Sequence, residues 1–153
     1  MTTRSGARER QQEPKLPLHA LLTRARDIAL EGLHQQLAEE GFEGIRFVHG
    51  SVFRYIDPEG SRLTTLAERS GLTKQALAEL VADLEKHGYL ERIADEADRR
   101  AKIIRLTEQG RAAQAAAGRI LEDVEQRWSG LLGKDQVAGL RRTLEQIVAL
   151  DAA

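Results

Sequence analysis

Apolar residues in the first third of this 153-residue chain recur at helical spacing. Between Leu16 and Leu37, leucine, isoleucine and alanine return every three or four positions, and Gly41 supplies a stop. This pattern predicts one N-terminal helix within residues 16–44. A second apolar segment runs from Ile45 to Ile56, and its length favours a helix that is closed by the turn sequence DPEG.

The next stretch of the chain has the pattern of two helices joined by a short turn. The first helix is apolar at positions 63, 66 and 67 and stops at Gly71. Its expected N-cap is Thr65 or Thr64, because Glu68 follows Thr65 at the spacing of a capping box. The second helix, over about 73–87, begins at the capping residue Thr73 and stops before Gly88. Two helices around a glycine-containing turn are typical of a helix-turn-helix.

After Gly88 the apolar period changes from that of a helix to that of a strand. The segments YLERI and AKIIRL are short and near-alternating, and a charged connector separates them, which predicts a β-hairpin over about 89–106. A helix-turn-helix followed by a hairpin is a winged helix. Two more helices are expected within 107–151, and their apolar faces are larger than one small lobe can cover. Helices at both ends of the chain therefore predict a dimerisation layer.

Composition narrows the class of protein. The chain has no cysteine, which excludes disulfides, thiolate metal sites and thiol redox switches. No apolar run reaches 18 residues and no signal-peptide pattern is present, so we expect a cytoplasmic protein with no membrane partner. No histidine lies in a metalloprotease motif, and no glycine-rich phosphate loop occurs. We therefore expect no catalytic residues and no cofactor.

Charge gives a weaker indication of the partner. The net charge of the chain is −1, and residues 62–105 carry nine Lys/Arg against eight Asp/Glu. Any nucleic-acid binding must then depend on where the cations lie rather than on a large positive field. Residues 1–15 form an expected flexible basic arm, in which four cations are candidates for extra phosphate contacts: Arg4, Arg8, Arg10 and Lys15.

Asp98, Arg100, Leu106 and Thr107 form an Asp-x-Arg-x5-Leu-Thr motif, preceded by LTTLAERSGLTKQALAELVADLEKHGYLER and followed by TEQG. With this motif and its flanks, the chain resembles the MarR family of bacterial transcriptional regulators over about residues 16–150. The resemblance implies a homodimeric winged helix, usually a repressor, that binds double-stranded DNA. It also implies that a small aromatic or anionic ligand often releases the protein from its operator.

The second helix of a helix-turn-helix lies in the major groove, where its N-terminal residues reach base edges. Here those residues are Thr73, Lys74 and Gln75, followed by Ala78 one turn on. Gln75 can bond adenine bidentately and Lys74 can reach guanine or a phosphate, while the small Ala78 allows close approach. The alternative is that Lys74 and Gln75 are polar first-turn residues without a partner.

The charged connector of the hairpin is the expected wing tip. Arg99 is the candidate for insertion into the minor groove, where arginine suits a narrow and negative channel, and Arg100 and Lys102 lie beside it. The family resemblance implies that Asp98 pairs with an arginine and that Asp98 and Arg100 stabilise the wing. The alternative is a solvated turn.

A possible effector cleft is implied by the resemblance, between the dimerisation layer and the winged-helix lobe. Arg46 with an aromatic wall would suit an organic carboxylate or phenolate, although packing and surface roles are equally open. The candidate lining residues are His19, Arg46, His49, Phe53 and Tyr55. Asp27, Glu31 and His34 also share one helical face, but such a trio is more often solvated than metal-binding, and no metal site is expected.

Together these patterns predict a mostly α-helical fold with a small β-hairpin wing. The expected order is the arm (1–15), an N-terminal dimerisation helix (16–44), a winged helix-turn-helix lobe (45–106) and C-terminal dimerisation helices (107–151). The expected function is sequence-specific DNA binding by a homodimer on a pseudo-palindromic operator. The alternative is a winged-helix module that binds proteins and no longer binds an operator.

Overall fold

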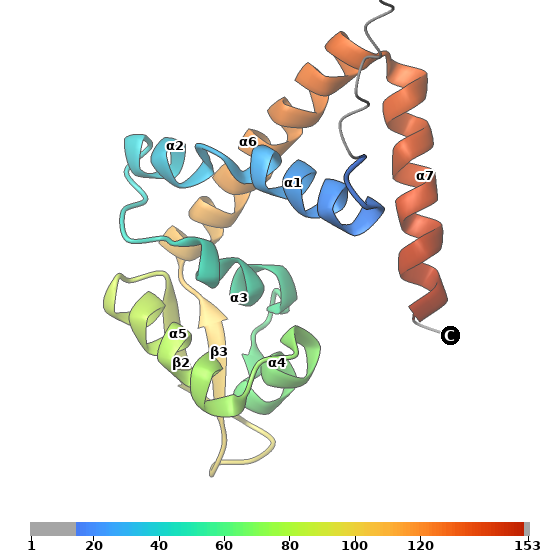
Figure 1. The fold of residues 1–153 in the computed structure, drawn as a ribbon. Coiled ribbons are helices and arrows are strands. Elements are labelled where there is room, and N and C mark those ends of the chain that lie inside the picture. The colour runs from blue at the N-terminus through green and yellow to red at the C-terminus, as the bar shows by residue number, and fades with distance from the viewer. Residues whose placement is uncertain (1–14, 152–153) are drawn as a thin grey trace, which may run out of the picture.

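The computed structural model describes residues 15–151, so Arg4, Arg8 and Arg10 of the expected arm lie outside the described residues. The chain is mostly helical with one small antiparallel sheet, which confirms the predicted fold class. A lobe of α3, α4, α5 and the sheet lies at one end of the molecule, and α6 rises from it towards α7, while α1 crosses between them (Figure 1). The elements are α1 (Leu18–Leu30), α2 (Leu33–Glu39), η1 (Phe47–His49), α3 (Gly50–Tyr55), β1 (Ser61–Arg62), α4 (Leu63–Ser70), α5 (Lys74–Lys86), β2 (Leu90–Ala94), β3 (Lys102–Leu106), α6 (Glu108–Leu132) and α7 (Lys134–Asp151).

The lobe has a closed apolar core. Leu66 of α4 and the residues Leu77, Val81 and Leu84 of α5 are at most 1% exposed. Thr73 caps α5 as the sequence predicted, since its Oγ1 accepts a hydrogen bond from the backbone N–H of Ala76 at 3.1 Å. This cap satisfies one of the free N–H groups of the first turn and fixes where α5 starts.

The predicted cap of α4 is wrong. The helix begins at Leu63, directly after β1, and its N-cap is Arg62, whose side chain makes no capping bond. Both Thr64 and Thr65 therefore lie inside the first turn. The reason is that the extended backbone of β1 runs straight into the helix and leaves no room for a later start.

The sheet has three strands in the order β1-β3-β2, all antiparallel. The predicted hairpin is present as β2 and β3, with Leu90 opposite Leu106 and Glu91 opposite Arg105. The third strand, β1, pairs Ser61 with Ile104 and was not predicted. With only two residues it has no period that the sequence could reveal.

The sequence TEQG joins the sheet to α6. The hydroxyl of Thr107 accepts from the backbone N–H of Gly110 at 3.0 Å and donates to the carbonyl oxygen of Gly88 at 2.6 Å. A Cβ atom at position 110 would lie only 2.0 Å from the carbonyl oxygen of Tyr89, so a glycine is required there. These contacts fix the first turn of α6 on the start of β2.

The N-terminal helix differs from the prediction. Instead of one helix within 16–44, the chain forms α1 and α2, separated at Gly32, whose φ of 78° lies in the left-handed region. Helix α2 buries Leu33 and Leu37, whereas α1 buries no residue within the chain. The break lets α2 pack on the core while α1 runs across the terminal helices.

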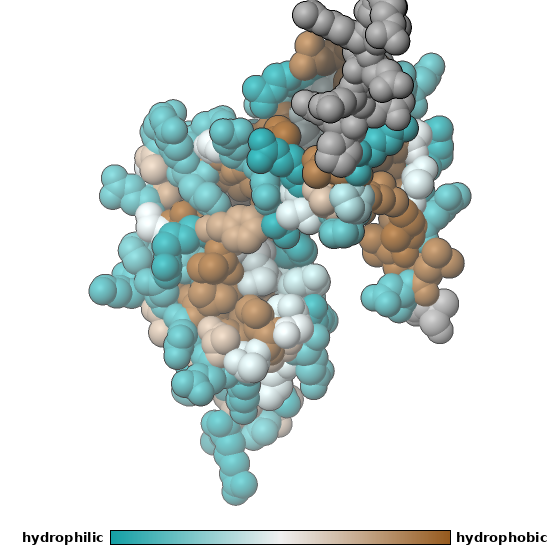
Figure 2. All heavy atoms as spheres, viewed as in Figure 1, coloured by the Kyte–Doolittle hydropathy of each residue, from teal (hydrophilic) through white to brown (hydrophobic). Residues whose placement is uncertain are grey.

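The terminal helices present a large apolar surface. In α7 only Val137 is buried, and Val148 and Leu150 are 71% and 78% exposed. Apolar side chains form a continuous brown area along this helix (Figure 2). Among residues 15–151, no helix combines the length and the apolar character needed to cross a membrane.

Candidate nucleic-acid interface

The first turn of α5 faces solvent. Thr73, Lys74 and Gln75 are exposed and Ala78 is half-buried, on the side of the helix away from Leu77. This arrangement follows from the helical period, because the apolar positions of α5 point into the lobe and leave the polar first turn outside. All four sequence-predicted residues of the recognition helix thus lie on one accessible surface.

The wing places its cations at the tip of the lobe. Arg99, Arg100 and Lys102 are exposed, and the loop between β2 and β3 extends beyond α4 and α5 (Figure 1). The loop is closed by Asp98, whose Oδ1 accepts from the backbone N–H of Arg100 at 3.0 Å and whose carbonyl oxygen accepts from the N–H of Ala101 at 2.9 Å. Asp98 therefore holds the turn through backbone groups rather than through an arginine side chain.

The arginine–aspartate pair of the wing joins different residues from those expected. Nε of Arg62, on β1, donates to Oδ2 of Asp95 at 2.9 Å, and Nη2 of Arg62 contacts the same oxygen. Asp95 is buried at the base of the wing and also accepts from the N–H of Ala97 at 3.0 Å. The hydrogen bond from Arg62 holds the pKa of the Asp95 carboxyl below its usual range, followed by that from Ala97. The pair connects the wing to the residue that precedes α4.

Five of the eleven Lys/Arg side chains in residues 45–106 form ion pairs within the chain. Arg46, Arg62, Arg69, Arg92 and Arg105 each contact a carboxylate within the chain. In the described part of residues 45–106, the Lys/Arg side chains without an ion pair are Arg54, Lys74, Lys86, Arg99, Arg100 and Lys102. Four of these six belong to the first turn of α5 or to the wing, so the free positive charge of the lobe is concentrated on this surface.

The effector candidates do not surround one cavity. Arg46 and His49 both contact Asp83, and His49 is fully buried. Phe53 packs edge-on against Tyr89 with ring centroids 6.5 Å apart. The two remaining candidates lie elsewhere, since His19 is exposed on α1 and the guanidinium of Arg54 lies 6.0 Å from the ring centroid of Tyr55.

A cavity of about 370 Å³ lies instead between α1, α2 and η1. Its lining includes Arg24, Ile28, His34 and Phe47, none of which the sequence indicated as an effector residue. Both ring nitrogens of His34 are buried and have no hydrogen-bond partner in the described structure. A buried polar group without a partner costs free energy, so this imidazole marks the cavity as a place for a ligand or a partner group.

The three ionisable residues that share one helical face in the sequence lie at the same cavity. Asp27, Glu31 and His34 all line this cavity. Yet no group of three His, Asp or Glu side chains within residues 15–151 has a geometry that would hold a metal ion.

Residues 43–101, which contain the helix-turn-helix and most of the wing, match the model of the MarR family. The winged-helix lobe of the chain is therefore similar to that of the MarR family. The transcriptional regulator HosA of Escherichia coli is 34% identical over 80 residues, which are 52% of this chain and 59% of HosA. The chain thus matches about three-fifths of the length of this relative.

Solved MarR-type structures extend the likeness to most of the chain. CouR from Rhodococcus jostii RHA1, bound to p-coumaroyl-CoA, is 28% identical with a TM-score of 0.65, covering 85% of this chain and 90% of CouR. The repressor CouR bound to a 23-mer DNA duplex is 27% identical with a TM-score of 0.69, covering 86% and 92%. MarR-family proteins are transcriptional regulators rather than enzymes, which agrees with the expectation from the sequence.

Proposed function

We propose that this chain is a sequence-specific DNA-binding regulator of transcription that acts as a homodimer on a pseudo-palindromic operator. The observation that carries the proposal is the placement of Lys74, Arg99, Arg100 and Lys102, the free cations on the exposed turn of α5 and on the wing. CouR, which shares this fold, has been solved on a DNA duplex, and its description as a repressor supports repression as the mode of action here. The bacterial relatives support action in the bacterial cytoplasm.

The docking follows from the geometry of a winged helix. The first turn of α5 enters the major groove, where Gln75 bonds adenine and Lys74 reaches guanine or a phosphate. The wing tip lies over the adjacent minor groove and inserts Arg99. Asp98 and the Arg62–Asp95 pair keep the wing in shape for that contact.

The homodimer is supported by apolar side chains of the terminal helices that remain exposed within one chain. A groove of about 600 Å³ between α6 and α7 is lined by residues such as Val124, Trp128, Leu140 and Leu144. Exposed apolar patches of this kind mark interfaces, because a monomer gains by removing them from water. A second copy would bring the same helices and bury the groove around a two-fold axis.

Fluorescence anisotropy with a labelled duplex from the upstream region of the gene tests the proposal. Four free cations per protomer give eight per dimer, so log Kd is expected to change with log salt concentration with a slope of about 7 in magnitude. Tight binding that persists in competitor DNA supports a sequence-specific regulator. Binding that competitor abolishes, on this duplex and on duplexes selected from a random pool, would contradict it and favour the protein-binding alternative.

We also propose that a small organic anion binds in the cavity between α1, α2 and η1 and releases the DNA. The orphan nitrogens of His34 and the guanidinium of Arg24 would supply the polar contacts, and Ile28 and Phe47 the apolar wall. Two related structures support ligand binding, since CouR is bound to p-coumaroyl-CoA and PcaV from Streptomyces coelicolor to its natural ligand, although PcaV is only 22% identical.

A screen of aromatic carboxylates and their coenzyme A thioesters by isothermal titration calorimetry tests the ligand proposal. A compound that binds wild type and weakens operator binding supports it. The His34→Phe variant, which fills the same space without ring nitrogens, is expected to lose most of that affinity. Equal affinity in His34→Phe and in the exposed control Arg127→Ala would place the ligand elsewhere.

A further inference from the structure

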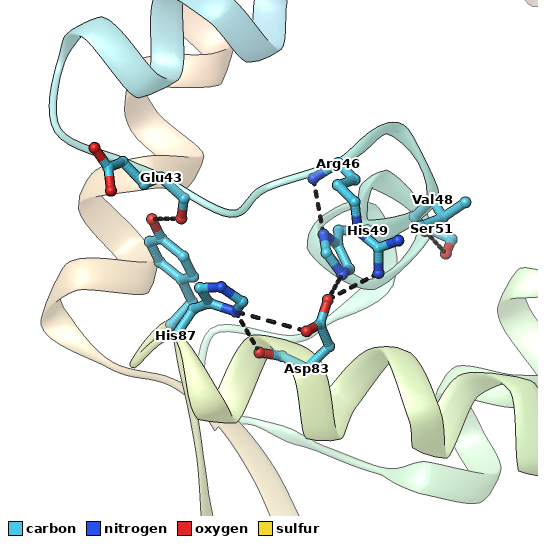
Figure 3. Close-up of polar contacts among 8 residues, drawn as sticks. Glu43, Arg46, Val48, His49, Ser51, Asp83 and His87 are labelled. Atoms are coloured by element: carbon cyan, nitrogen blue, oxygen red, sulfur yellow. Dashed lines mark hydrogen bonds and ion pairs between the residues drawn. The ribbon is translucent and has the colours of Figure 1, made fainter.

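Arg46, His49 and Asp83 form a polar cluster, here named the Asp83 cluster, between the recognition helix and the segment that follows α2 (Figure 3). Asp83 lies on α5, whereas Arg46 and His49 lie 37 and 34 residues earlier in the chain. Oδ2 of Asp83 accepts from Nη2 of Arg46 at 2.9 Å and is 2.8 Å from Nε2 of His49. The His49 side chain has no exposed surface, so this contact lies inside the lobe.

The hydrogen bonds of His49 define its tautomer. Nδ1 accepts from the backbone N–H of Arg46 at 2.9 Å, so this nitrogen carries no proton. In the neutral ring the proton is then on Nε2, which donates to Asp83. If Nδ1 were protonated, its N–H would face the backbone N–H of Arg46, and two donors would oppose each other. The neutral imidazole therefore fits the cluster at both nitrogens.

Two further contacts join the same segment to the end of α5. The hydroxyl of Tyr89 donates to the carbonyl oxygen of Glu43 at 2.6 Å. Gly44, with a φ of 81°, lies so close to the ring of His87 that a Cβ atom there would be 2.4 Å from Cδ2. His87 in turn donates from Nδ1 to the carbonyl oxygen of Asp83 at 2.8 Å. Residues 43–49 therefore contact Asp83 in the C-terminal half of α5 and also His87 and Tyr89, just after the helix ends.

The other end of this segment is fixed to α6. Helix α2 buries Leu33 and Leu37 in the same core as Ile120 of α6. Nη2 of Arg119 on α6 donates to Glu40 at 2.8 Å, just after α2 ends. A continuous set of contacts thus runs from α6 through α2 and residues 43–49 to the recognition helix.

We propose that Asp83 is a positioning residue for DNA binding, which fixes the tilt of α5 relative to α6 and so sets the separation of the two recognition helices in the dimer. This inference rests on the proposed function. Asp83 lies nine residues from Lys74, so at 1.5 Å per residue the two are about 14 Å apart along the helix. A tilt of about 10° around Asp83 would move Lys74 by roughly 2.4 Å, which is enough to break a hydrogen bond to a base edge.

The distance along α5 from Asp83 to its first turn explains why a residue that touches no base can control specificity. Asp83 lies near the end of α5 that is remote from the DNA, while Lys74 and Gln75 lie at the end that reaches the groove. The apolar face of α5 resists translation of the helix but limits its tilt less strictly. The directional hydrogen bonds of the Asp83 cluster supply that restraint.

Electron spin resonance distance measurements between two labelled protomers test the proposal. The chain has no cysteine, so a Gln75→Cys substitution carries the only spin label on each recognition helix. In otherwise wild-type, DNA-free protein, we expect a narrow distribution of label–label distances. In Asp83→Ala we expect a distribution at least twice as broad, or one with a displaced maximum, because alanine keeps the helix but removes the acceptor.

Asp123→Ala is the matched control. Asp123 is an exposed aspartate on α6 that makes no hydrogen bond or ion pair within the described residues, so its removal changes the charge by the same amount. We expect its distance distribution to match wild type. Asp83→Asn keeps the shape and one acceptor oxygen but loses the charge that faces Arg46. It should broaden the distribution less, and it replaces Asp83→Ala if that variant does not fold.

The outcomes separate the inference from the function on which it rests. An unchanged narrow distribution in Asp83→Ala, even with lowered thermal stability, would show a purely structural contact and overturn the inference alone. No dipolar coupling between labels in the wild-type background would mean that no dimer forms, which overturns the proposed function as well. If the distribution broadens in Asp83→Ala, we also expect the operator affinity of this variant to fall at least tenfold. That affinity should also depend less on the spacing of the two half-sites.

Discussion

The winged-helix lobe and the terminal helices bury their apolar residues to very different extents. In the lobe, Leu77, Val81 and Leu84 have no exposed surface, whereas Val148 and Leu150 of α7 are more than 70% exposed. Both regions have clear amphipathic patterns, so the sequence alone does not distinguish them. The lobe thus buries its core within one chain, whereas the apolar faces of α1 and α7 remain largely exposed and would be covered by the proposed second copy.

The largest expected effect comes from a charge placed on the apolar face of α7, where it should disrupt the proposed dimer. We expect Val148→Asp to raise the dimer dissociation constant about a thousandfold, because an unpaired charge in a buried interface costs about 3–5 kcal/mol. Sedimentation equilibrium measures the change. Gln146→Asp adds a charge two residues earlier on the same helix, at a position outside the groove lining, and should leave the association nearly unchanged. Equal effects from both substitutions would move the interface away from this face.

Truncation of the closed core gives the next largest effect. Leu84→Ala removes a fully buried side chain and is expected to lower the free energy of unfolding by about 3 kcal/mol. Leu150→Ala, at a position 78% exposed within one chain, should cost much less at protein concentrations below the dimer dissociation constant. Urea unfolding of both variants makes the comparison. A similar loss in the two would mean that the lobe core is not closed.

Removal of the wing-tip cation affects DNA binding without affecting the core. Arg99→Ala is expected to weaken operator binding more than tenfold, which corresponds to at least about 1.4 kcal/mol. The side chain is exposed and makes no ion pair in the described structure, so the thermal midpoint should not change. Anisotropy at fixed salt measures the affinity. The control is Arg127→Ala, which removes an exposed arginine of α6. Unchanged operator affinity in Arg99→Ala would contradict the proposed contact between the wing and DNA.

The smallest effect is a pH dependence of stability from the lobe. Burial lowers the pKa of His49, against the raising effect of Asp83 and with a lesser lowering from Arg46 and His87. The unfolded chain therefore binds the proton more readily than the folded chain. The free energy of unfolding should fall as the pH drops below about 6.5, the ordinary value for histidine. Asp83 does not mask this, because the hydrogen bond from Arg46 holds the pKa of its carboxyl below the usual range.

Urea unfolding between pH 7.5 and 5.5 checks the His49 effect. His49→Asn keeps an acceptor and a donor but does not titrate, so its stability should vary less with pH over this interval. A wild-type profile that is flat, or one that is equally steep in His49→Asn, would assign the pH dependence to other groups.

The sequence predicted those parts of the molecule that depend on local patterns. The recognition helix, its Thr73 cap and the β2–β3 hairpin follow from residues within one or two turns of each other, and all are present. The division of the N-terminal helix was missed, because a single glycine at position 32 is compatible with a continuous helix until packing selects the left-handed conformation. The cap of α4 was misplaced for a similar reason, since β1 sets the start of that helix.

The long-range contacts of the candidate site could not be predicted from the sequence. Arg62 and Asp95 are 33 residues apart, and three nearby acids, Glu91, Glu96 and Asp98, would compete for the arginine in any pattern-based pairing. His49 was an effector candidate because the family resemblance implies a ligand cleft near this part of the chain. In the structure its partner is Asp83, on another helix. His34 was considered only as a metal ligand, and its orphan nitrogens become visible only once α1 and α2 are placed.

The close approach of Gly110 to Tyr89 bears on how mutational data for this protein should be interpreted. In a deep mutational scan scored by reporter expression, nearly every amino-acid substitution at position 110 should abolish regulation of the reporter. The effect should be as strong as that of substitutions at a base-contacting position. Yet Gly110 is buried at the start of α6 and touches no groove. Intolerance to substitution will therefore not identify the nucleic-acid surface by itself. A parallel scan scored by protein abundance would separate the two kinds of position.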